Sequence, residues 1–412
     1  MSYVLLFVLL LIFVYLKISN NQFPISKQIQ NSKFKIQNLF ITGLLIISFV
    51  SIFFALNKWL ALYKLGWLVL GAGLFWLIAR AEYDRAKFAG CLLCGLAMQS
   101  LLAIWQFLAQ STFANKWLGL SWHGASELGA SVIETVGSDG VGERWLRAYG
   151  GLDHPNVLGG ILAISVLFII GEYLKFSIFN FQFSNKFKIQ NSKIIFWLFL
   201  IIFSAALFFS FSRAAWLALA AGLAVMLSGA VIKKNLAAQK NILQAVLISG
   251  LVFFILFFQF PNLVMTRLYG GERLEIKSGN ERLESVKNSL NIIKKNWAIG
   301  AGIGNYTLAL GRELPARESY FYQPAHNVYI LIFSEIGIVG FILFICLIIY
   351  WLIFNIQYPI SNKISNPKLE IRNWKLEIGE SKGANYAMIN FGVLAALVVL
   401  MSLDHWFWSL HF

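Results

Sequence analysis

Long apolar runs alternate with polar intervals along the whole chain. An α-helix needs about 20 apolar residues to cross a hydrocarbon core roughly 30 Å thick, and ten runs approach that length, the first being the shortest. They occupy 3–16, 39–56, 59–79, 88–109, 157–174, 194–212, 214–232, 241–260, 327–354 and 386–403. The runs are continuous, and only helices and closed barrels satisfy backbone groups in lipid. The pattern therefore predicts an all-α, polytopic integral membrane protein with about ten transmembrane helices, in which residues 1–412 form one multi-span domain.

The composition agrees with a membrane protein. Hydrophobic residues make up 58% and charged residues 13% of the 412, and the mean hydropathy is +0.68. Soluble domains carry about 25% charged residues, so a soluble globular protein is excluded. Residues 1–16 contain no basic residue and Lys17 follows them, which favours an uncleaved anchor with its N-terminus outside.

The net charge of +15 gathers in every second polar interval. These intervals are 17–38, 80–87, 175–193, 233–240 and 355–385, and together they contain 19 of the 34 Lys and Arg residues. Positive charge concentrates in cytoplasmic loops, so we assign the intervals to the cytoplasm and expect no nucleic acid partner. The hexapeptide KFKIQN occurs twice on this side, at 33–38 and 186–191. The protein is thus predicted to be a multi-pass protein of the cytoplasmic (inner) membrane, in contact with the lipid bilayer.

Two longer intervals, 110–156 and 261–326, fall on the extracytoplasmic side. In the second, apolar residues recur at spacings of three and four, which predicts an amphipathic helix of about four turns lying along the membrane surface. These residues are Leu283, Val286, Leu290, Ile293 and Trp297. Glycines at 300, 302 and 304 end the helix. They follow a helix and lack Gly-Lys-Ser, so a tight turn is favoured over a phosphate loop.

Two arginines on the outer side are candidate phosphate ligands. Arg213 lies between two apolar runs with no loop, so its guanidinium is held at the outer edge of the bilayer. Either it extends to lipid headgroups, or its planar fork binds phosphate oxygens. Arg282 lies on the amphipathic helix beside Glu281 and Glu284. A solvated helix face is the simpler interpretation of Arg282, and a phosphate ligand is the alternative.

His326 is the strongest candidate for proton transfer. Pro324 fixes the approach of the chain and Asn327 begins the next apolar run, so the histidine stands at a helix N-terminus. That position disfavours the imidazolium ion and leaves a neutral ring able to accept a proton. The alternative is a histidine hydrogen-bonded to a neighbouring loop. Farther along the same run, Glu335 is an acid deep within the membrane span. It either has a functional role or forms a structural pair with a residue such as an arginine.

The first outer interval ends at another histidine. Arg147, His154 and Asn156 precede or begin a new apolar run, and we group them as candidate substrate-binding residues. Neither HExxH nor another close ligand spacing occurs, so no metal is expected. Cys91 and Cys94 lie within an apolar run, where small packing residues are the simpler interpretation than a redox pair.

Four segments together resemble one family. They are RAYGGLDHPNVLGG at 147–160, FSFSRAAWLAL at 209–219, ERLESVKNSLNIIKKNWAIGAGIGNY at 281–306 and HNVYILIFSEIGIVG at 326–340. In this order and spacing they resemble the O-antigen ligase and polymerase superfamily over residues 140–345. The resemblance implies an outward-facing glycosyltransferase that moves a glycan from a polyprenyl diphosphate, such as undecaprenyl diphosphate, to the hydroxyl of a glycan, lipid or protein acceptor. It implies no cofactor.

The resemblance also implies roles for individual residues. Arg213 and Arg282 match diphosphate-binding arginines, and His326 matches an essential histidine. Stabilised leaving-group charge and a neutral base suit a direct inverting displacement, so we predict these three as catalytic residues. Tyr306 and Asn327 are predicted to orient substrate, and Glu335 joins the candidate substrate-binding residues.

Three other interpretations stay open. A polymerase of the same superfamily catalyses similar chemistry, and a transporter or flippase handles similar lipid-linked glycans. Transporters usually place polar groups and broken helices near the membrane midplane, whereas the charges here gather at the outer edge. The stretch Asp404, His405, Trp406, Phe407, Trp408 resembles one that a further span follows in the family, whereas the sequence stops at Phe412, so we expect either a truncated gene or one missing span. An inactive structural protein is the third interpretation.

Overall fold

The computed structural model describes residues 32–80, 85–136, 142–175, 192–316, 318, 321–364 and 377–409. The chain forms two compact units. Unit 1 comprises 1–82, 280–354 and 401–412, and unit 2 comprises 83–279 and 355–400. The predicted anchor at 3–16 and the second KFKIQN copy lie outside the described residues.

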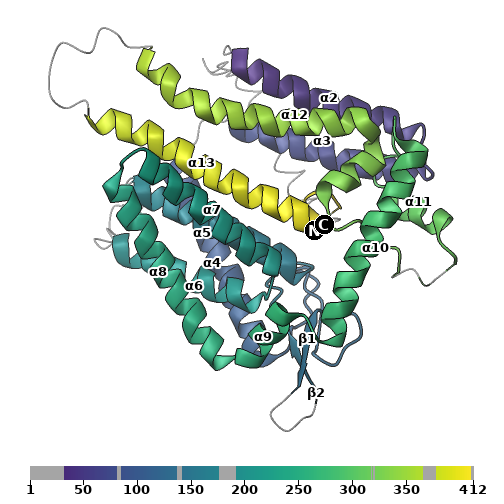
Figure 1. The fold of residues 1–412 in the computed structure, drawn as a ribbon, viewed down its shortest axis with the longest axis horizontal. Helices are drawn as coiled ribbons and strands as arrows, with labels where there is room; N and C mark the ends of the chain where they lie inside the picture. Colours follow the sequence, from purple (N-terminus) through teal and green to yellow (C-terminus); the bar gives the residue numbers. More distant parts are fainter. Residues whose placement is uncertain are drawn as a thin grey trace. The chain divides into compact units, whose positions relative to one another are not determined.

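Unit 2 is built around a buried apolar helix. Helix α5 (Pro155–Lys175) packs against α6 (Ser192–Phe209), α7 (Arg213–Ile232) and α8 (Leu236–Gln259), and α4 (Arg85–Ala109) packs on α6 (Figure 1). Apolar residues surround α5 on all sides, which is the pattern of a core helix. Gly159 lets α5 approach the turn before α7, because a Cβ there would lie 2.7 Å from the Ser210 hydroxyl oxygen.

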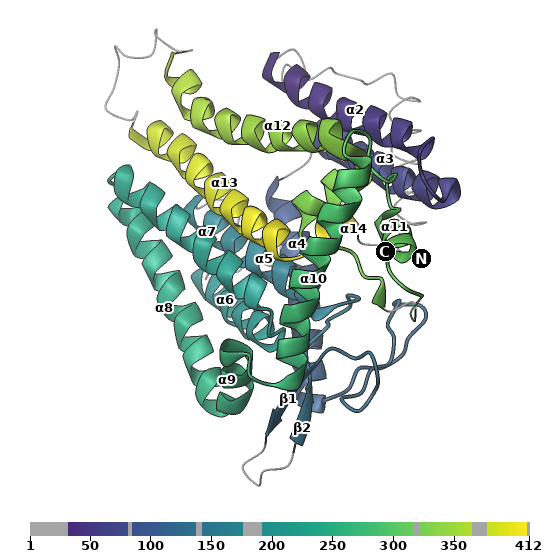
Figure 2. The same ribbon diagram turned by 45° about the vertical axis from the view of Figure 1, so that its right-hand side comes forward.

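The first outer interval contains a β-hairpin. Strands β1 (Val132–Val136) and β2 (Gly142–Leu146) pair antiparallel, with Val132 opposite Leu146. Helix α9 (Pro261–Tyr269) packs on β1 (Figure 2). Val132, Leu146 and Tyr149 form a small buried cluster that explains why this polar interval is ordered. The fold is mostly helical, in agreement with the predicted class, and this hairpin is an element that the sequence did not predict.

Unit 1 begins with a helical hairpin. Helices α2 (Ser32–Ile52) and α3 (Lys58–Arg80) pack side by side (Figure 1), and the Trp76 indole N–H donates to Asn38 at 2.8 Å. The remaining elements are the larger part of α10 (Arg273–Asn296), α11 (Tyr306–Glu313), α12 (Val328–Ile364) and α14 (Trp406–Ser409). Helix α13 (Glu377–Leu403) belongs to unit 2 except for its last turn.

Helix α12 is broken at Gly337, where φ is 66°. The glycine turn after α10 fills the break: Ala301 N–H donates to the Ser334 carbonyl at 2.8 Å, and Gly302 N–H donates to the Glu335 carbonyl at 3.0 Å. Gly300 and Gly302 have φ values of 83° and 95°, which only glycine adopts readily. The predicted tight turn is confirmed, and it satisfies backbone groups that the broken helix exposes.

The membrane helices agree with the apolar runs in position. Six described helices are long and apolar enough to cross a membrane. They are Lys58–Ala79, Phe88–Ala109, Pro155–Leu174, Arg213–Ile232, Leu236–Gln259 and Val328–Ile353. Three shorter apolar helices, Ile36–Ile52, Ile194–Phe209 and Ala387–Leu403, fall on three further runs. A polytopic membrane protein is supported, whereas the count of about ten spans is not confirmed.

The amphipathic helix in the second outer interval is confirmed and is longer than predicted. Helix α10 begins at Arg273, ten residues before Leu283. The predicted apolar stripe is solvent-exposed in the structure: Leu283 is 74% exposed and Trp297 is 60% exposed. Within 283–297, the buried positions are instead Ser289 and Ile292. The face that packs within unit 1 is thus the neighbouring, partly polar one.

Candidate functional site

His326 stands immediately before α12, as predicted. The preceding Ala325 is completely buried in the core cluster that α11 and α12 share, which anchors the loop. Asn327 caps the helix, because its side-chain oxygen accepts from the Ile330 N–H at 3.0 Å. The Nδ1 atom of His326 is buried and has no hydrogen-bond partner among the described residues. The histidine is therefore fixed by its backbone, while one ring nitrogen is left unsatisfied.

A second histidine packs against the first. The rings of His326 and His405 meet edge to face, with centroids 5.1 Å apart and an interplanar angle of 86°. His405 is held by Asp404, whose carboxylate accepts from the His405 backbone N–H at 2.8 Å, and by a hydrogen bond between its Nδ1 and the Ser409 hydroxyl. The sequence did not identify His405 as a site residue. Its position just after an apolar run, like that of His326 just before one, was the available signal.

Arg282 brings positive charge to the two histidines. Its Nε atom is buried without a hydrogen-bond partner among the described residues, although α10 is largely solvent-facing here. The guanidinium acts electrostatically on both His326 and His405. The solvated-face interpretation of Arg282 therefore does not fit this arrangement, because an exposed arginine would keep its donors in water.

Both imidazoles are held neutral. Burial lowers the pKa of His326 from 6.5 to about 4, with further lowering from His405 and Arg282, while Asp404 and Glu281 oppose the shift. Burial likewise lowers the pKa of His405, and Asp404 again opposes it. The sequence argument expected a neutral His326 because of the helix N-terminus. The structure gives burial as the main cause and neighbouring positive groups as the second.

The three other predicted residues of unit 1 have structural partners. The Tyr306 hydroxyl lies 2.7 Å from that of buried Ser289, and burial raises the pKa of Tyr306. The Asn327 amide donates to the Ser402 carbonyl at 3.0 Å. Glu335 accepts from the Gly304 N–H and from the Trp408 indole N–H, both at 2.8 Å. Each of these side chains supports the loops that carry the two histidines.

Lys64 adds a buried charge inside a span of unit 1. It is 3% exposed and interacts electrostatically with Glu335. Within the described spans, Glu335 is thus accompanied by a second charged residue, Lys64. Glu172, near the end of another span, is also buried.

In unit 2, Arg213 begins α7. Ser212 caps the helix, with its hydroxyl accepting from the Ala215 N–H at 3.4 Å. The Arg213 guanidinium donates to the Arg267 carbonyl at 3.0 Å and lies 2.9 Å from the Glu275 carboxylate. Its side chain remains 32% exposed. A guanidinium has five N–H donors, so this arginine is anchored and still has donors to offer.

Glu275 also binds a second arginine. It forms an ion pair with Arg267, which in turn donates to the Phe211 carbonyl at 3.1 and 2.9 Å. Glu275 and Arg267 are both buried. Sequence reasoning missed this pair, because Arg267 and Glu275 are eight residues apart around a helix end and nothing in their spacing identifies Arg213 as their partner.

Arg147, His154 and Asn156 are engaged within unit 2. Arg147 is buried and donates to the Ser210 carbonyl at 2.8 Å and to the Asn156 side chain at 2.6 Å. The His154 Nδ1 accepts from the Asn156 backbone N–H at 3.1 Å, so in the neutral ring Nε2 donates to the Ser131 hydroxyl at 2.9 Å. These residues tie the first outer interval to the start of α5 and to the turn before α7.

The family model for O-antigen ligase matches residues 198–345. This region, 148 of the 412 residues, is similar to the O-antigen ligase family. The match contains Arg213, Arg282 and His326, and it supports the resemblance for the last three of the four segments, while 147–160 lies outside it. No curated protein sequence matches the chain significantly.

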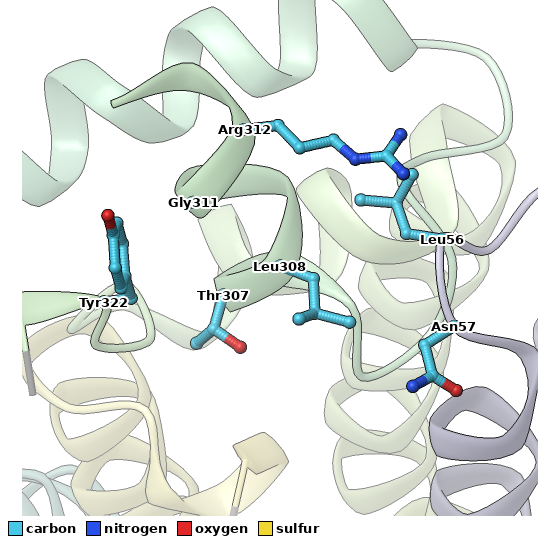
Figure 3. A pocket seen from close by; sticks show the side chains of 7 residues that line it. All are labelled: Leu56, Asn57, Thr307, Leu308, Gly311, Arg312 and Tyr322. Carbon is cyan, nitrogen blue, oxygen red and sulfur yellow. The ribbon is translucent and has the colours of Figure 1, made fainter. Parts of the chain in front are cut away.

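The O-antigen ligase region also lines a groove in unit 1. The cavity has a volume of about 610 Å³ and is bordered by residues from the α2–α3 turn, α11 and the loop after it. These are Leu56, Asn57, Thr307, Leu308, Gly311, Arg312 and Tyr322. Figure 3 shows the Arg312 guanidinium extending toward Leu56, with Tyr322 on the other side of Thr307. Neither His326 nor His405 lines this groove.

The described residues contain no group of three or more His, Cys, Asp or Glu side chains arranged to hold a metal ion.

Proposed function

We propose that this protein is a membrane glycosyltransferase. It transfers a glycan from a polyprenyl diphosphate carrier to an acceptor hydroxyl on the outer face of the cytoplasmic membrane. The observation that carries the proposal is the pairing, within a region similar to O-antigen ligases, of a neutral, half-buried histidine with a half-buried arginine. His326 and Arg282 each have a nitrogen without a hydrogen-bond partner among the described residues, and imidazole and guanidinium are the groups that a hydroxyl and a diphosphate require.

The proposed reaction is a single inverting displacement. The acceptor oxygen attacks the anomeric carbon, its proton passes to a nitrogen of His326, and the bond from that carbon to the diphosphate oxygen breaks. The electron pair leaves with the polyprenyl diphosphate, whose added negative charge Arg282 stabilises. The products are the glycosylated acceptor, the free polyprenyl diphosphate and one proton, first held by His326. Arginine suits this role because its fork donates two parallel hydrogen bonds to phosphate oxygens.

Donor binding also strengthens the base. A group with a pKa of about 4 is neutral at physiological pH but accepts a proton weakly. Part of that lowering comes from the charge of Arg282. A bound diphosphate neutralises this charge and adds negative charge of its own, and both effects raise the pKa of His326. The site thus holds a base that becomes effective when the donor is in place.

Arg213 is proposed as a second diphosphate ligand. In unit 2 it is oriented by Glu275 and by the Arg267 carbonyl, and these two contacts leave other N–H donors of its guanidinium for a ligand. A preoriented donor loses little side-chain entropy on binding, which favours tight recognition of the leaving group. Arg213→Ala in the transfer assay described below tests this role.

Ligation is the proposed reaction, and polymerisation is the alternative within the same chemistry. The two differ only in the acceptor, which is a different molecule in ligation and a growing glycan in polymerisation. A transporter of lipid-linked glycans is the candidate from another class, and the broken helix α12 is the observation that favours it. However, the carbonyls of Ser334 and Glu335 at the break accept from the glycine turn, so they are not free to bind a substrate.

The test is reconstitution of the full chain in proteoliposomes with a polyprenyl diphosphate glycan and candidate acceptors. We expect acceptor glycosylation, lost in His326→Ala and in Arg282→Ala. Arg273→Ala is the matched control, because this arginine lies on the same helix and is 74% exposed. Transfer that survives His326→Ala and Arg282→Ala would falsify the mechanism. Movement of intact donor across the bilayer without bond cleavage would establish the transporter instead.

A further inference from the structure

We propose that His405 is a positioning residue for His326, holding its ring in one orientation and shielding it from protonation. The inference deepens the proposed function and rests on it for the role of His326 as the base. The contact between the two rings does not depend on that function.

The first support is the contact between the rings. An edge-to-face pair with centroids 5.1 Å apart lies within the range in which aromatic rings attract one another. Because the Nδ1 atom of His326 has no hydrogen-bond partner among the described residues, no polar bond to a side chain fixes its rotation at that atom. The ring of His405 is the described aromatic neighbour that restricts it.

His405 is itself rigidly held. Its backbone N–H is bound by Asp404, its Nδ1 atom by Ser409, and the Ser409 hydroxyl also lies 3.1 Å from the His405 carbonyl. Asp404 is 4% exposed, so the carboxylate belongs to the interior. A side chain restrained at both its backbone and its ring can transmit that restraint to a neighbour.

Two further hydrogen bonds connect the segments that carry the histidines. The Asn327 amide donates to the Ser402 carbonyl at 3.0 Å. Asn327 directly follows His326, and Ser402 lies three residues before His405. The Trp408 indole donates to Glu335 at 2.8 Å. The beginning of α12 and the stretch 402–408 are therefore joined by two hydrogen bonds in addition to the ring contact. Both segments belong to unit 1.

The charges around the pair give His405 its second role. Asp404 beside it, Arg282 and Glu281 on α10, and Lys64 on α3 are the charged groups that act on the two rings. Asp404 favours a proton on His405, and a charged His405 disfavours one on His326. A proton taken up by His405 therefore opposes protonation of the neighbouring His326 ring.

The geometry argues against two other roles. No hydrogen bond joins the two rings, so His405 does not relay the proton directly in this arrangement. A metal site is not formed either, since the described residues hold no group of three potential ligands.

The test measures the titration of each histidine in the reconstituted full chain. The chain has five histidines, so ring-labelled protein gives few NMR signals, and the signal of His326 is the one missing from His326→Asn. His405→Ala removes the ring and its charge, whereas His405→Phe keeps an aromatic ring and removes the charge together with the hydrogen bond to Ser409. His123→Phe is the matched control, because His123 stacks on Tyr149 in unit 2 with centroids 4.6 Å apart.

We expect the titration midpoint of His326 to rise in both His405 variants, by on the order of one pH unit, and to stay unchanged in His123→Phe. In glycan transfer, kcat should fall about 10- to 100-fold in His405→Ala and recover to within about threefold in His405→Phe, with the donor KM nearly constant. A wild-type midpoint for His326 in the folded His405→Phe protein would overturn the proposal, whether or not His405→Ala folds. If the wild-type protein transfers no glycan, the proposed function fails while the titration still decides the pairing.

Discussion

The pH dependence of transfer follows from the environment of His326. The base works only as the neutral imidazole, so activity is fully present above its pKa and is lost as the pH falls through that value. An unperturbed histidine, with a pKa of about 6.5, is about 90% protonated at pH 5.5. With a pKa of about 4, His326 is only about 3% protonated at that pH. We therefore expect kcat/KM for the donor at pH 5.5 to remain within about 10% of its value at pH 7.5.

Measuring kcat separately sharpens this prediction. The profile of kcat/KM reports the free enzyme, whereas the profile of kcat reports the complex with substrate. If the diphosphate offsets the charge of Arg282, the acid limb of kcat lies at a higher pH than that of kcat/KM. The assay is the initial rate of transfer in proteoliposomes between pH 4 and 8, at limiting and at saturating donor. A kcat/KM limb near 6.5, or two limbs at the same pH, would refute the reasoning.

Three substitutions test the supporting structure through thermal unfolding in detergent. Glu275→Ala leaves buried Arg267 and partly exposed Arg213 without their shared anion and should cost about 3–5 kcal/mol, whereas Glu313→Ala, at the exposed ion pair with Lys295, should cost less than about 1 kcal/mol. Equal losses would show that the buried Glu275–Arg267 pair adds nothing. Gly300→Ala should cost about 1–3 kcal/mol because its φ is positive and Glu335 is in contact, against almost nothing for Gly279→Ala in open space. Tyr306→Phe should cost about 1 kcal/mol and leave kcat/KM within about threefold, because the hydroxyl is bound by Ser289; a loss of 100-fold would instead give the hydroxyl a role in the reaction.

The helices were predictable because lipid imposes a simple rule. A continuous apolar run must become a helix in a membrane, and the described helices fall on nine of the ten runs. The β-hairpin at Val132 was not predicted, since its stability comes from a small cluster with Leu146 and Tyr149 that no single stretch reveals. The early start of α10 was missed because its first residues lack the apolar spacing that marked its later turns.

The break in α12 was equally hidden. The run 327–354 reads as uninterrupted, and Gly337 alone does not break a helix. It breaks because the glycine turn after α10 supplies the N–H groups that the carbonyls of Ser334 and Glu335 accept. The partner of a local feature thus lies more than 30 residues away in sequence.

The candidate site was predictable in its parts but not in its contacts. His326 and Arg282 were identified by residue type and by their position near the membrane edge, and the structure brings them into one electrostatic environment. His405 was named only within a stretch that resembles the family and was not predicted as a site residue. Its pairing with His326 spans 79 positions and depends on tertiary structure. The helix N-terminus was invoked to keep His326 neutral, and burial proved to be the larger cause.

The most direct test of the account is the stoichiometry of one turnover. Proteoliposomes containing the wild-type chain receive donor labelled in both its glycan and its lipid diphosphate, together with an acceptor. The account predicts one free polyprenyl diphosphate for each glycosylated acceptor, and neither product from His326→Ala while Arg273→Ala behaves as wild type. Labelled glycan still attached to its carrier after prolonged incubation of the wild-type protein with every acceptor class would contradict it.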